Sequence, residues 1–332
     1  MATVAGGALT AQAAPIPITA VTTAQLLADF NVIVQGDDNS NDIAGPVLVG
    51  GNLGPGTGPL NSTGVILGTN PGTTAITGYG EVNIFGNQTS FTNDSIGTVF
   101  VGGTISSSLT PFGSGATSVT SHYAFPPGAT TADNAATFQN NIWAKMTTLS
   151  TGLAGLSSPS SVSGSTFTGV ANANGVAVFN LTLAQLNALS GTLSFGGCLA
   201  ATNPGGPCDG VINVTGTGTL SQGFAFPLST VFPNLIVNFS SGVTVDVGNV
   251  WTASILDPLG SVSAATDITG DIIAENFTTT SETHLPGFDC SDNLCGMTAP
   301  PFVPEPGSLS MLGSALAALA IFGVIRRRRH PG

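Results

Sequence analysis

Carboxylate and amide side chains crowd one short segment near the start of the chain. These oxygens are the ligands that Ca²⁺ prefers in proteins. The segment is not an EF-hand loop, because Leu48 stands where that loop has its bidentate glutamate. Two interpretations remain open: a calcium site, or a solvated turn of Asx residues that binds no metal or other cofactor. The candidate ligands are Asp37, Asn39, Asn41 and Asp42.

A second group of acids could serve a hydrolase, which needs two carboxylates that face each other across a cleft. On stacked strands, acids at these spacings are more often turn residues, so we expect no catalytic residue and keep a polysaccharide-acting hydrolase as the alternative. A polysaccharide lyase is disfavoured, since the body offers only Lys145 for charge neutralisation or proton abstraction. The acids are Asp246, Asp257, Asp267, Asp271 and Glu275.

Threonines occupy alternate positions in the segment Val214–Thr219. Because successive side chains of a strand point to opposite faces, we expect the hydroxyls of Thr215, Thr217 and Thr219 on one face. Such a ladder could order water and so bind ice, which gives a third candidate function. Threonines are also good strand formers, so a purely structural role stays open.

Four cysteines form two close pairs, Cys198 with Cys208 and Cys290 with Cys295. In an exported chain this pattern predicts two small loops, each closed by a disulfide. Free buried thiols are the alternative. Zinc is less favoured, because neither pair has the C-x-x-C spacing of a structural site.

The elements that position these residues are expected to be mainly β. The chain has 332 residues, of which 45 are Gly and 21 Pro, and only 7% are charged, which is typical of a turn-rich β architecture. Short β-branched runs closed by Gly begin about 17 to 18 residues apart. Such a period predicts a parallel β-solenoid, β-helix-like, with one strand per coil stacked in register. The runs are Val47–Gly51, Val65–Gly68, Val82–Gly86 and Val99–Gly103.

One segment, Thr131–Leu156, has helical periodicity instead. Its apolar residues recur at intervals of three and four, and Asp133 stands near the predicted start. A lone helix must bury its apolar stripe, so we expect this one to flank the solenoid. The stripe consists of Ala135, Phe138, Ile142, Met146, Leu149 and Leu153.

The N-terminal residues 1–13 are mostly small and apolar and end in an A-x-A pattern formed by Ala11 and Ala13. This pattern predicts the remnant of a signal peptide with cleavage after Ala13. A first strand with chance alanines is the alternative. Export of the chain follows from the first interpretation.

The C-terminal tail combines three signals. Pro304, Glu305 and Pro306 form an extended break, and the apolar run Leu309–Ile325 is just long enough to span a membrane. Four arginines then hold that end on the cytoplasmic side. The arginines are Arg326, Arg327, Arg328 and Arg329.

The positive charge of the chain is concentrated in this tail. Five residues are Lys or Arg against 17 Asp or Glu, the formal net charge is −12, and Lys145 is the one base upstream of Arg326. Phosphate neutralisation needs clustered Lys or Arg, which the acidic region upstream of the tail lacks, so we expect no nucleic-acid partner.

The tail from Val303 to Arg329 resembles the PEP-CTERM sorting signal of Gram-negative bacteria. The resemblance implies an exosortase-type processing enzyme as partner and a C-terminal transmembrane sorting helix that contacts the inner membrane transiently. It also implies removal of the tail at Pro304–Pro306 and release of the body to the outer surface or extracellular matrix. A permanent single-span anchor is the alternative.

The body, from about Thr23 to Phe288, resembles the choice-of-anchor A domain. The resemblance is loosened at Asp257-Pro258, where that family usually has Ala-Pro. It implies an adhesive or structural role on the cell surface or in a biofilm matrix, with extracellular polysaccharide or other matrix components as partners. We therefore divide the chain into residues 1–13, a domain at 14–290, a linker at 291–303 and the sorting signal at 304–329. The segments that carry the resemblance are Phe30–Gly36, Val47–Asn52, Ser254–Val262, Ile268–Ala274 and His284–Phe288.

Overall fold

The computed structural model describes residues 18–40, 42–54, 66–67, 76, 79–89, 98–105, 118–125, 130–200, 208–227, 232–285, 288 and 294. All of these belong to one compact unit, Met1–Thr298, and the second unit, Ala299–Gly332, lies outside the described residues. The described part contains no helix with the length and apolar character needed to cross a membrane. Several predicted features fall outside the described residues: Ala11, Ala13, Asn41, Cys290, Cys295, the linker at 291–303, Pro304, Glu305, Pro306 and Arg326 to Arg329.

The described part is mainly β, with few helices. The helical elements are η1 (Ile18–Ala20), α1 (Thr23–Asp29), η2 (Thr131–Asp133), α2 (Asn134–Phe138), η3 (Gln139–Trp143, a π-helical turn), α3 (Ala144–Ala154) and α4 (Leu183–Asn187). The strands of the first half are β1 (Val32–Val34), β2 (Asp38–Asn39), β3 (Asp42–Ile43), β4 (Val47–Val49), β5 (Ile66–Leu67), β6 (Val82–Ile84), β7 (Thr98–Val101) and β8 (Ser118–Ser121).

The remaining strands follow the long helix in the sequence. They are β9 (Ser161–Ser163), β10 (Thr166–Gly169), β11 (Val176–Thr182), β12 (Gly191–Thr192), β13 (Ser194–Gly197), β14 (Asp209–Thr215), β15 (Gly218–Ser221), β16 (Phe224–Ala225), β17 (Leu235–Phe239), β18 (Val243–Val247), β19 (Ser254–Ala264), β20 (Ile268–Thr269), β21 (Ile272–Thr279) and β22 (Glu282–His284).

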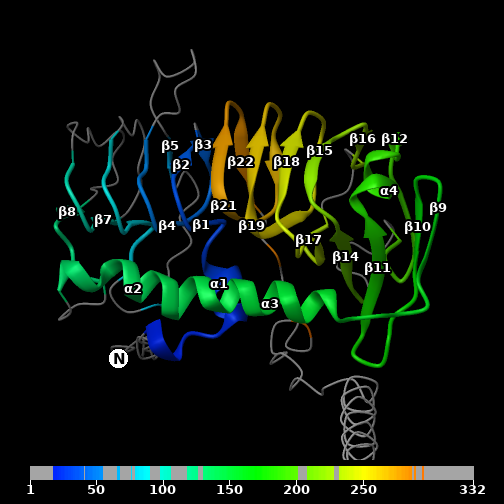
Figure 1. The fold of residues 1–332 in the computed structure, drawn as a ribbon, viewed down its shortest axis with the longest axis horizontal. Helices are drawn as coiled ribbons and strands as arrows, with labels where there is room; N and C mark the ends of the chain where they lie inside the picture. Colours follow the sequence, from blue (N-terminus) through cyan, green and yellow to red (C-terminus); the bar gives the residue numbers. More distant parts are fainter. Residues whose placement is uncertain are drawn as a thin grey trace, which may run out of the picture. The chain divides into compact units, whose positions relative to one another are not determined.

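One parallel sheet of 13 strands dominates the fold, in the order β11-β14-β17-β19-β21-β1-β4-β6-β7-β8 with β15, β18 and β2 beside this path. The order differs from the sequence: β1 lies in the middle, between β21 and β4. From there the chain runs outward to β8 at one end. The helix α2–α3 then carries it along the sheet to β11 at the other end, and the later strands return to the middle (Figure 1). Two halves of the sequence therefore meet at the β1–β21 pair.

The glycine-closed repeats do not all stack as the sequence predicts. β4 pairs with β6, with Val47 opposite Val82, so the run between them is skipped. That run contains β5, which pairs with β3 in a separate four-stranded parallel sheet. The prediction of one strand per period was wrong at Val65–Gly68. A β-branched run with a closing Gly is found on more than one side of the stack, because strands on every side bury apolar residues.

Two hydrophobic clusters hold the fold together. One lies on the inner side of the strands and includes Val34, Val49 and Phe277, and the other lies between the main sheet and the helix and includes Ile33, Leu48 and the helix residues. The helix over 131–154 and its flanking position confirm the sequence prediction. Its buried residues include Phe138, Ile142, Met146, Leu149 and Leu153, but Ala135 is exposed.

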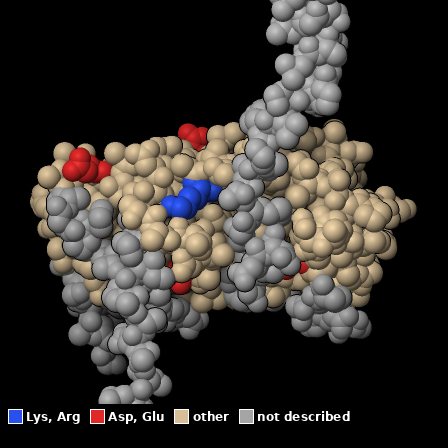
Figure 2. Space-filling model, turned by 90° about the horizontal axis from the view of Figure 1, so that it is seen from below, with Lys and Arg blue, Asp and Glu red and all other residues tan. Residues whose placement is uncertain are grey.

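Buried asparagines attach the helix to the sheet. Asn238 donates a hydrogen bond to the carbonyl of Ser150 (2.9 Å) and accepts one from its hydroxyl (2.6 Å). Asn213 donates to the carbonyl of Leu153 (2.7 Å). Figure 2 shows the face that carries the helix, on which charged side chains are few and well separated among the described residues. Because both asparagines are buried and their amides find partners on the helix, these bonds fix the helix in register along the sheet.

The disulfide predicted between Cys198 and Cys208 is confirmed, with a sequence separation of 10. It joins the residue after β13 to the residue before β14 and closes a loop at the β11 end of the sheet. Disulfides persist in oxidising compartments, so the bond indicates an extracellular or surface protein.

Candidate binding face

The strands β15, β18, β19 and β21 present small polar side chains on one side and apolar side chains on the other. In β18 the residues alternate between buried and exposed from Val243 to Val247. The inward side chains from the four strands stack in one row in the interior cluster. Period-two alternation in the sequence therefore sets which side chains reach solvent. The inward row consists of Leu220, Val245, Val262 and Phe277.

The outward side chains form two rows in register. We call these nine residues the hydroxyl face. The first row is Thr219, Thr244, Ser261 and Asn276, and the second is Ser221, Asp246, Ser263, Thr278 and Asn39. Neighbouring strands lie about 4.7–4.9 Å apart, and alternate residues along a strand about 6.6 Å apart, so the side chains form a regular grid. Most members are hydroxyls, and Asp246 is its one carboxylate.

The prediction that three threonines line one face of a single strand was wrong. β14 ends at Thr215 and β15 begins at Gly218, and the chain turns between them at Gly216 (φ 104°) and Gly218 (φ 128°). Of the three threonines, Thr219 joins the hydroxyl face, whereas Thr217 lies in the turn. The hydroxyls line up across strands, one per coil, because in-register parallel pairing aligns equivalent positions of successive coils.

The first row continues beyond Asn276 into a chain of hydrogen-bonded Asx residues, which we call the amide ladder. Asn276 Oδ1 accepts from the backbone N–H of Asp37 (3.1 Å). Asp37 Oδ1 in turn accepts from the backbone (2.8 Å) and side-chain (3.1 Å) N–H groups of Asn52. Asn52 Oδ1 does the same for Asn87 at 2.9 and 3.1 Å. Asn87 Oδ1 accepts from the backbone N–H (2.9 Å) and the hydroxyl (3.0 Å) of Thr104. The ladder thus satisfies backbone N–H groups at the corner of each coil.

The residues predicted to bind calcium are dispersed in the described part. Asp37 belongs to the amide ladder and Asn39 to the hydroxyl face. Asp42 begins β3, and its side chain lies outside the described residues. Within the described part, no three His, Cys, Asp or Glu side chains come together as a metal site. A calcium site therefore remains a prediction.

Three buried carboxyl groups lie where the two halves of the sequence meet. Burial raises the pKa of Asp38 to about 6, while Ser40 opposes this shift by donating to Asp38 Oδ1 from its hydroxyl (2.6 Å) and its backbone N–H (3.0 Å). Burial also raises the pKa of Asp257 to about 8, which the N–H of Val243 partly opposes. The sequence contains no signal for this burial beyond the neighbouring apolar residues.

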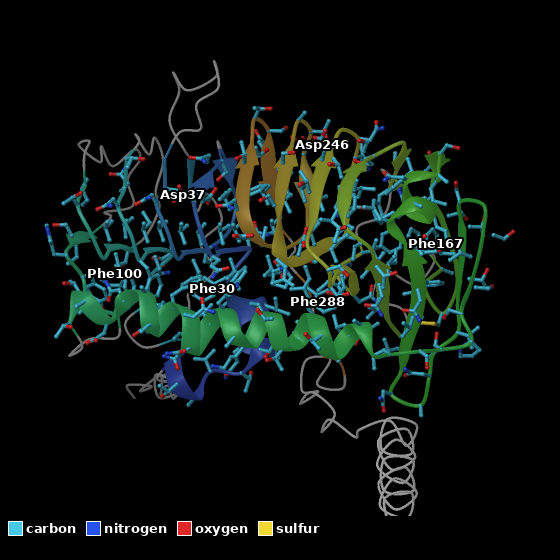
Figure 3. The ribbon with its side chains drawn as sticks, viewed as in Figure 1. Phe30, Asp37, Phe100, Phe167, Asp246 and Phe288 are labelled. Atoms are coloured by element: carbon cyan, nitrogen blue, oxygen red, sulfur yellow. A yellow bond between two sulfur atoms is a disulfide. The ribbon has the colours of Figure 1, made fainter. Side chains whose placement is uncertain are left out.

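Asp271 is the third buried acid, and burial raises its pKa to about 8. Its Oδ2 accepts the backbone N–H of Phe288 (2.8 Å), which ties the closing segment of the body to the sheet. Asn31, which precedes β1, donates to the carbonyl of Gly270 (2.9 Å) beside it. Figure 3 shows Phe288 on the helix side of the sheet, while Asp37 and Asp246 lie on the other side.

The acids proposed for a hydrolase do not face one another across a cleft in the described part. Asp257 and Asp271 are buried, whereas Asp246 and Glu275 are exposed on strands. Asp267 lies near His284 (3.7 Å), which also pairs with Glu282 (3.3 Å). A hydrogen bond from the Ser281 hydroxyl is the main cause that lowers the pKa of Asp267. In this surface cluster, Asp267 and Glu282 both contact the same imidazole of His284.

The comparisons with known proteins identify the body. A family model described as "Putative Ice-binding-like adhesive domain" matches residues 23–285. The chain belongs to this family. Members share an adhesive description rather than a catalytic one, and the match spans both halves of the sheet together with the helix between them. Membership and the disulfide together indicate an adhesive surface or extracellular protein. No curated protein and no solved structure matches the chain.

Proposed function

We propose that this chain is an exported protein that adheres to extracellular polysaccharide through the hydroxyl face. The observation that carries the proposal is the in-register grid of small polar side chains on adjacent strands of an adhesive-family domain. Short hydroxyl side chains on a sheet have little rotamer freedom to lose, and each can donate and accept a hydrogen bond. Many weak contacts along a repetitive polymer then add through multivalency.

The body is best understood as a β-solenoid of the choice-of-anchor A type, a finer assignment than the adhesive family itself. Parallel pairing between strands 15 to 35 residues apart, such as Val32 with Val47 and Val47 with Val82, supports stacked coils. The role is structural or adhesive in a biofilm or exopolysaccharide matrix. Catalytic turnover is not part of the proposal, because the carboxylates are buried or dispersed.

Delivery to the surface is proposed to depend on the tail. Pro304, Glu305 and Pro306 supply the recognition segment for an exosortase-type enzyme, and Arg326 to Arg329 keep the apolar run at the inner membrane until cleavage. The body is then released to the outer surface or matrix of a Gram-negative bacterium. Mass spectrometry of the mature protein is expected to find a C-terminus before Gly307, whereas a C-terminus at Gly332 would contradict the processing step.

The test of adhesion compares two matched double variants. Thr244→Leu with Thr278→Leu removes two exposed hydroxyls from the grid and adds bulk, while Thr166→Leu with Thr168→Leu makes the same change on the exposed side of β10. Binding to an immobilised panel of neutral and acidic bacterial exopolysaccharides is expected to weaken about tenfold in the first variant and to remain unchanged in the second. Equal binding by both variants would remove the hydroxyl face as the site.

The same grid favours ice as a second candidate ligand, since regular hydroxyl rows can order a layer of water. Thermal hysteresis measured on the parent chain and both double variants separates the two functions. Hysteresis that is lost only in the Thr244→Leu, Thr278→Leu variant, without polysaccharide binding by the parent, would replace polysaccharide with ice. Release of reducing sugar from the panel would instead support a hydrolase.

A further inference from the structure

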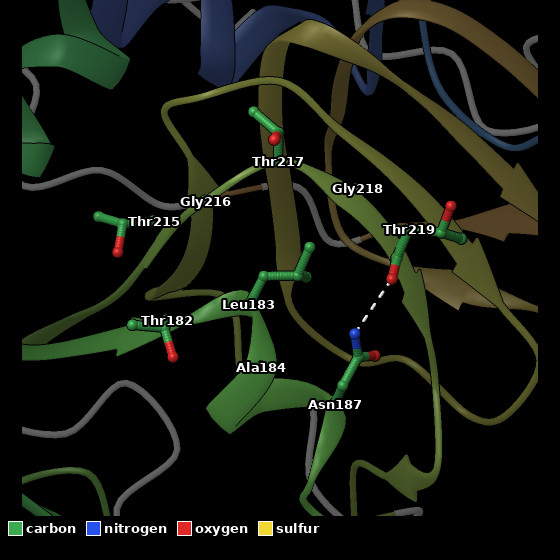
Figure 4. Close-up of a pocket in the computed structure, with 9 residues that line it drawn as sticks. All are labelled: Thr182, Leu183, Ala184, Asn187, Thr215, Gly216, Thr217, Gly218 and Thr219. Atoms are coloured by element: carbon green, nitrogen blue, oxygen red, sulfur yellow. Dashed lines mark hydrogen bonds between the residues drawn. The ribbon is translucent and has the colours of Figure 1, made fainter.

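A hollow of about 480 Å³ adjoins the hydroxyl face. It lies between the start of α4 and the turn that joins β14 to β15, and Figure 4 shows its lining residues. Thr219 belongs both to the hollow and to the first row of the hydroxyl face, so the hollow is continuous with that row. The principal lining residues are Thr182, Leu183, Asn187, Thr215, Thr217 and Thr219.

Two glycines keep the hollow from being filled. Gly216 and Gly218 have φ angles of 104° and 128°, a backbone conformation that side-chain-bearing residues rarely adopt. A Cβ at Gly216 would lie 3.7 Å from Leu183 Cβ, and one at Gly218 would lie 3.5 Å from Leu183 Cδ2. Any side chain at either position would therefore occupy the space above Leu183. The base of the hollow consists of glycine backbone and an aliphatic side chain.

The polar side chains at the rim of the hollow differ in the hydrogen bonds that they make. Asn187 donates to the carbonyl of Thr219 (3.0 Å) and accepts from the N–H of Ser221 (3.0 Å), so its amide holds β15 in place (Figure 4). Thr182 caps α4 by accepting from the N–H of Gln185 (3.2 Å). Within the described part of the chain, the hydroxyls of Thr217 and Thr219 make no hydrogen bond to protein, and both residues are exposed. These two hydroxyls are available to a ligand.

The lining determines the chemical class of the ligand. It contains no charged residue, so nothing in it would neutralise a phosphate, a carboxylate or a metal cation. An apolar base with hydroxyls above it matches a pyranose, which has an aliphatic ring face and hydroxyls that donate and accept. The volume lies within the range of small-molecule sites, about 300–1,000 Å³. We propose that the hollow binds one neutral pyranose unit of a polysaccharide, with Thr217 and Thr219 as hydrogen-bonding partners.

This assignment rests on the proposed polysaccharide adhesion and gives it a specificity. The grid of the hydroxyl face contacts the polymer along its length, and the hollow selects a neutral unit at one end of the first row. Because hydroxyl contacts exposed to water are individually weak, the affinity for a single short oligosaccharide is expected to be low, and selectivity arises in the context of the polymer.

The test uses three neutral tetrasaccharides, cellotetraose, mannotetraose and maltotetraose, with tetragalacturonic acid as the acidic comparison. Binding to the full chain is followed by saturation-transfer NMR and titration. Thr217→Val with Thr219→Val removes both hydroxyls at nearly constant volume, and Thr166→Val with Thr168→Val on β10 is the matched control. At least one neutral tetrasaccharide is expected to bind, about tenfold more weakly to the first variant than to the parent and equally well to the control.

Several outcomes would overturn the assignment. These are no binding of any neutral tetrasaccharide to the parent, equal binding by the Thr217→Val, Thr219→Val variant, or tighter binding of tetragalacturonic acid. Thermal melts of both variants show whether the fold is retained. If these tests fail while adhesion is still weakened in the Thr244→Leu, Thr278→Leu variant, the hollow is removed as a sugar site and the proposal of polysaccharide adhesion stands. Tetrasaccharide binding by a parent chain that does not adhere to the polymers would keep the hollow as a sugar site and contradict polysaccharide adhesion.

Discussion

One row of outward side chains runs across both halves of the sequence but serves a different purpose in each. On the strands after the long helix, the row is Thr219, Thr244 and Ser261, whose side chains point to solvent. From Asn276 onward, through Asp37 and the residues beyond it, the same row becomes the amide ladder. The position in the coil is equivalent, yet one half leaves its side chains exposed to solvent and the other hydrogen-bonds them within the protein.

The difference follows from strand length. β18 has five residues and β19 eleven, so the backbone N–H groups beside the row are satisfied by sheet pairing. β4 and β6 have only three residues each, and the chain turns immediately afterwards, so Asn52 and Asn87 must satisfy N–H groups with their side chains. Longer strands thus leave a row of side chains exposed, whereas shorter strands use the same row to hydrogen-bond the backbone at the corner.

The largest expected effect concerns the junction between the halves, where Asp38, Asp257 and Asp271 are buried. Their folded pKa values, about 6, 8 and 8, lie above the ordinary value of 3.8, so the folded chain binds more protons than the unfolded chain between those values. Stability is therefore fully present below about pH 4 and falls as the pH rises through 6 to 8. We expect the free energy of unfolding to fall from pH 5 to pH 8 by about 1.4 kcal/mol per pH unit for each of these acids that is still protonated in the folded chain.

The measurement is chemical denaturation across this pH range, with hydrogen exchange at β1 and β21 to localise the change. Asp257→Asn is expected to lessen the pH dependence by about one bound proton. Asp246→Asn, on the exposed face, is the matched control and should leave the dependence as it is in the parent. An unchanged dependence in Asp257→Asn would show that this acid is ionised in the folded chain.

The next effect separates the two parts of the row directly. Asn52→Ala removes the amide that donates to Asp37 and the oxygen that accepts from Asn87. We expect a loss of about 2 kcal/mol in the free energy of unfolding, since three hydrogen bonds are lost and one backbone N–H loses its partner. Thr244→Ala, at the equivalent position in the other half, should cost less than about 0.5 kcal/mol. Equal losses in the free energy of unfolding for Asn52→Ala and Thr244→Ala, measured in denaturant, would contradict the distinction between the amide ladder and the hydroxyl face.

The smallest effect tests the boundary of the ladder. Asn276→Thr extends the hydroxyl row by one strand and removes the oxygen that accepts the N–H of Asp37. A loss of about 1 kcal/mol is expected, because the backbone N–H of Asp37 loses its side-chain acceptor while the sheet pairing of Asn276 persists. Denaturant melts measure it, with Thr278→Ser on the same strand as control. A gain in the stability of Asn276→Thr would show that the amide ladder does not begin at Asn276.

The elements that depend on local spacing were predictable from the sequence. The helix over Thr131–Leu156 appears with its apolar stripe buried, because residues three and four apart share a face. Ala135 is the exception: it lies in the first turns of the helix and is exposed. The bond between Cys198 and Cys208 also followed from their spacing in an exported chain.

The elements that depend on pairing were harder to predict. Ile66–Leu67 looked like part of the main repeat but joins the separate sheet with β3. The alternating threonines looked like one strand but are divided by two glycines with positive φ, which sequence alone does not distinguish from strand glycines. Asp257 was expected to be a turn residue, but it lies within β19 and is buried.

The sequence by itself determined that the chain forms short β-branched strands and one amphipathic helix, because side-chain periodicity is local. It also determined that the body has almost no positive charge and that the tail has most of it. Only the tertiary structure decided that β1 lies between β21 and β4, and hence that hydroxyls from successive coils align into a face. The physical reason is that strand partners are chosen by long-range burial and hydrogen bonding, which no window of neighbouring residues contains.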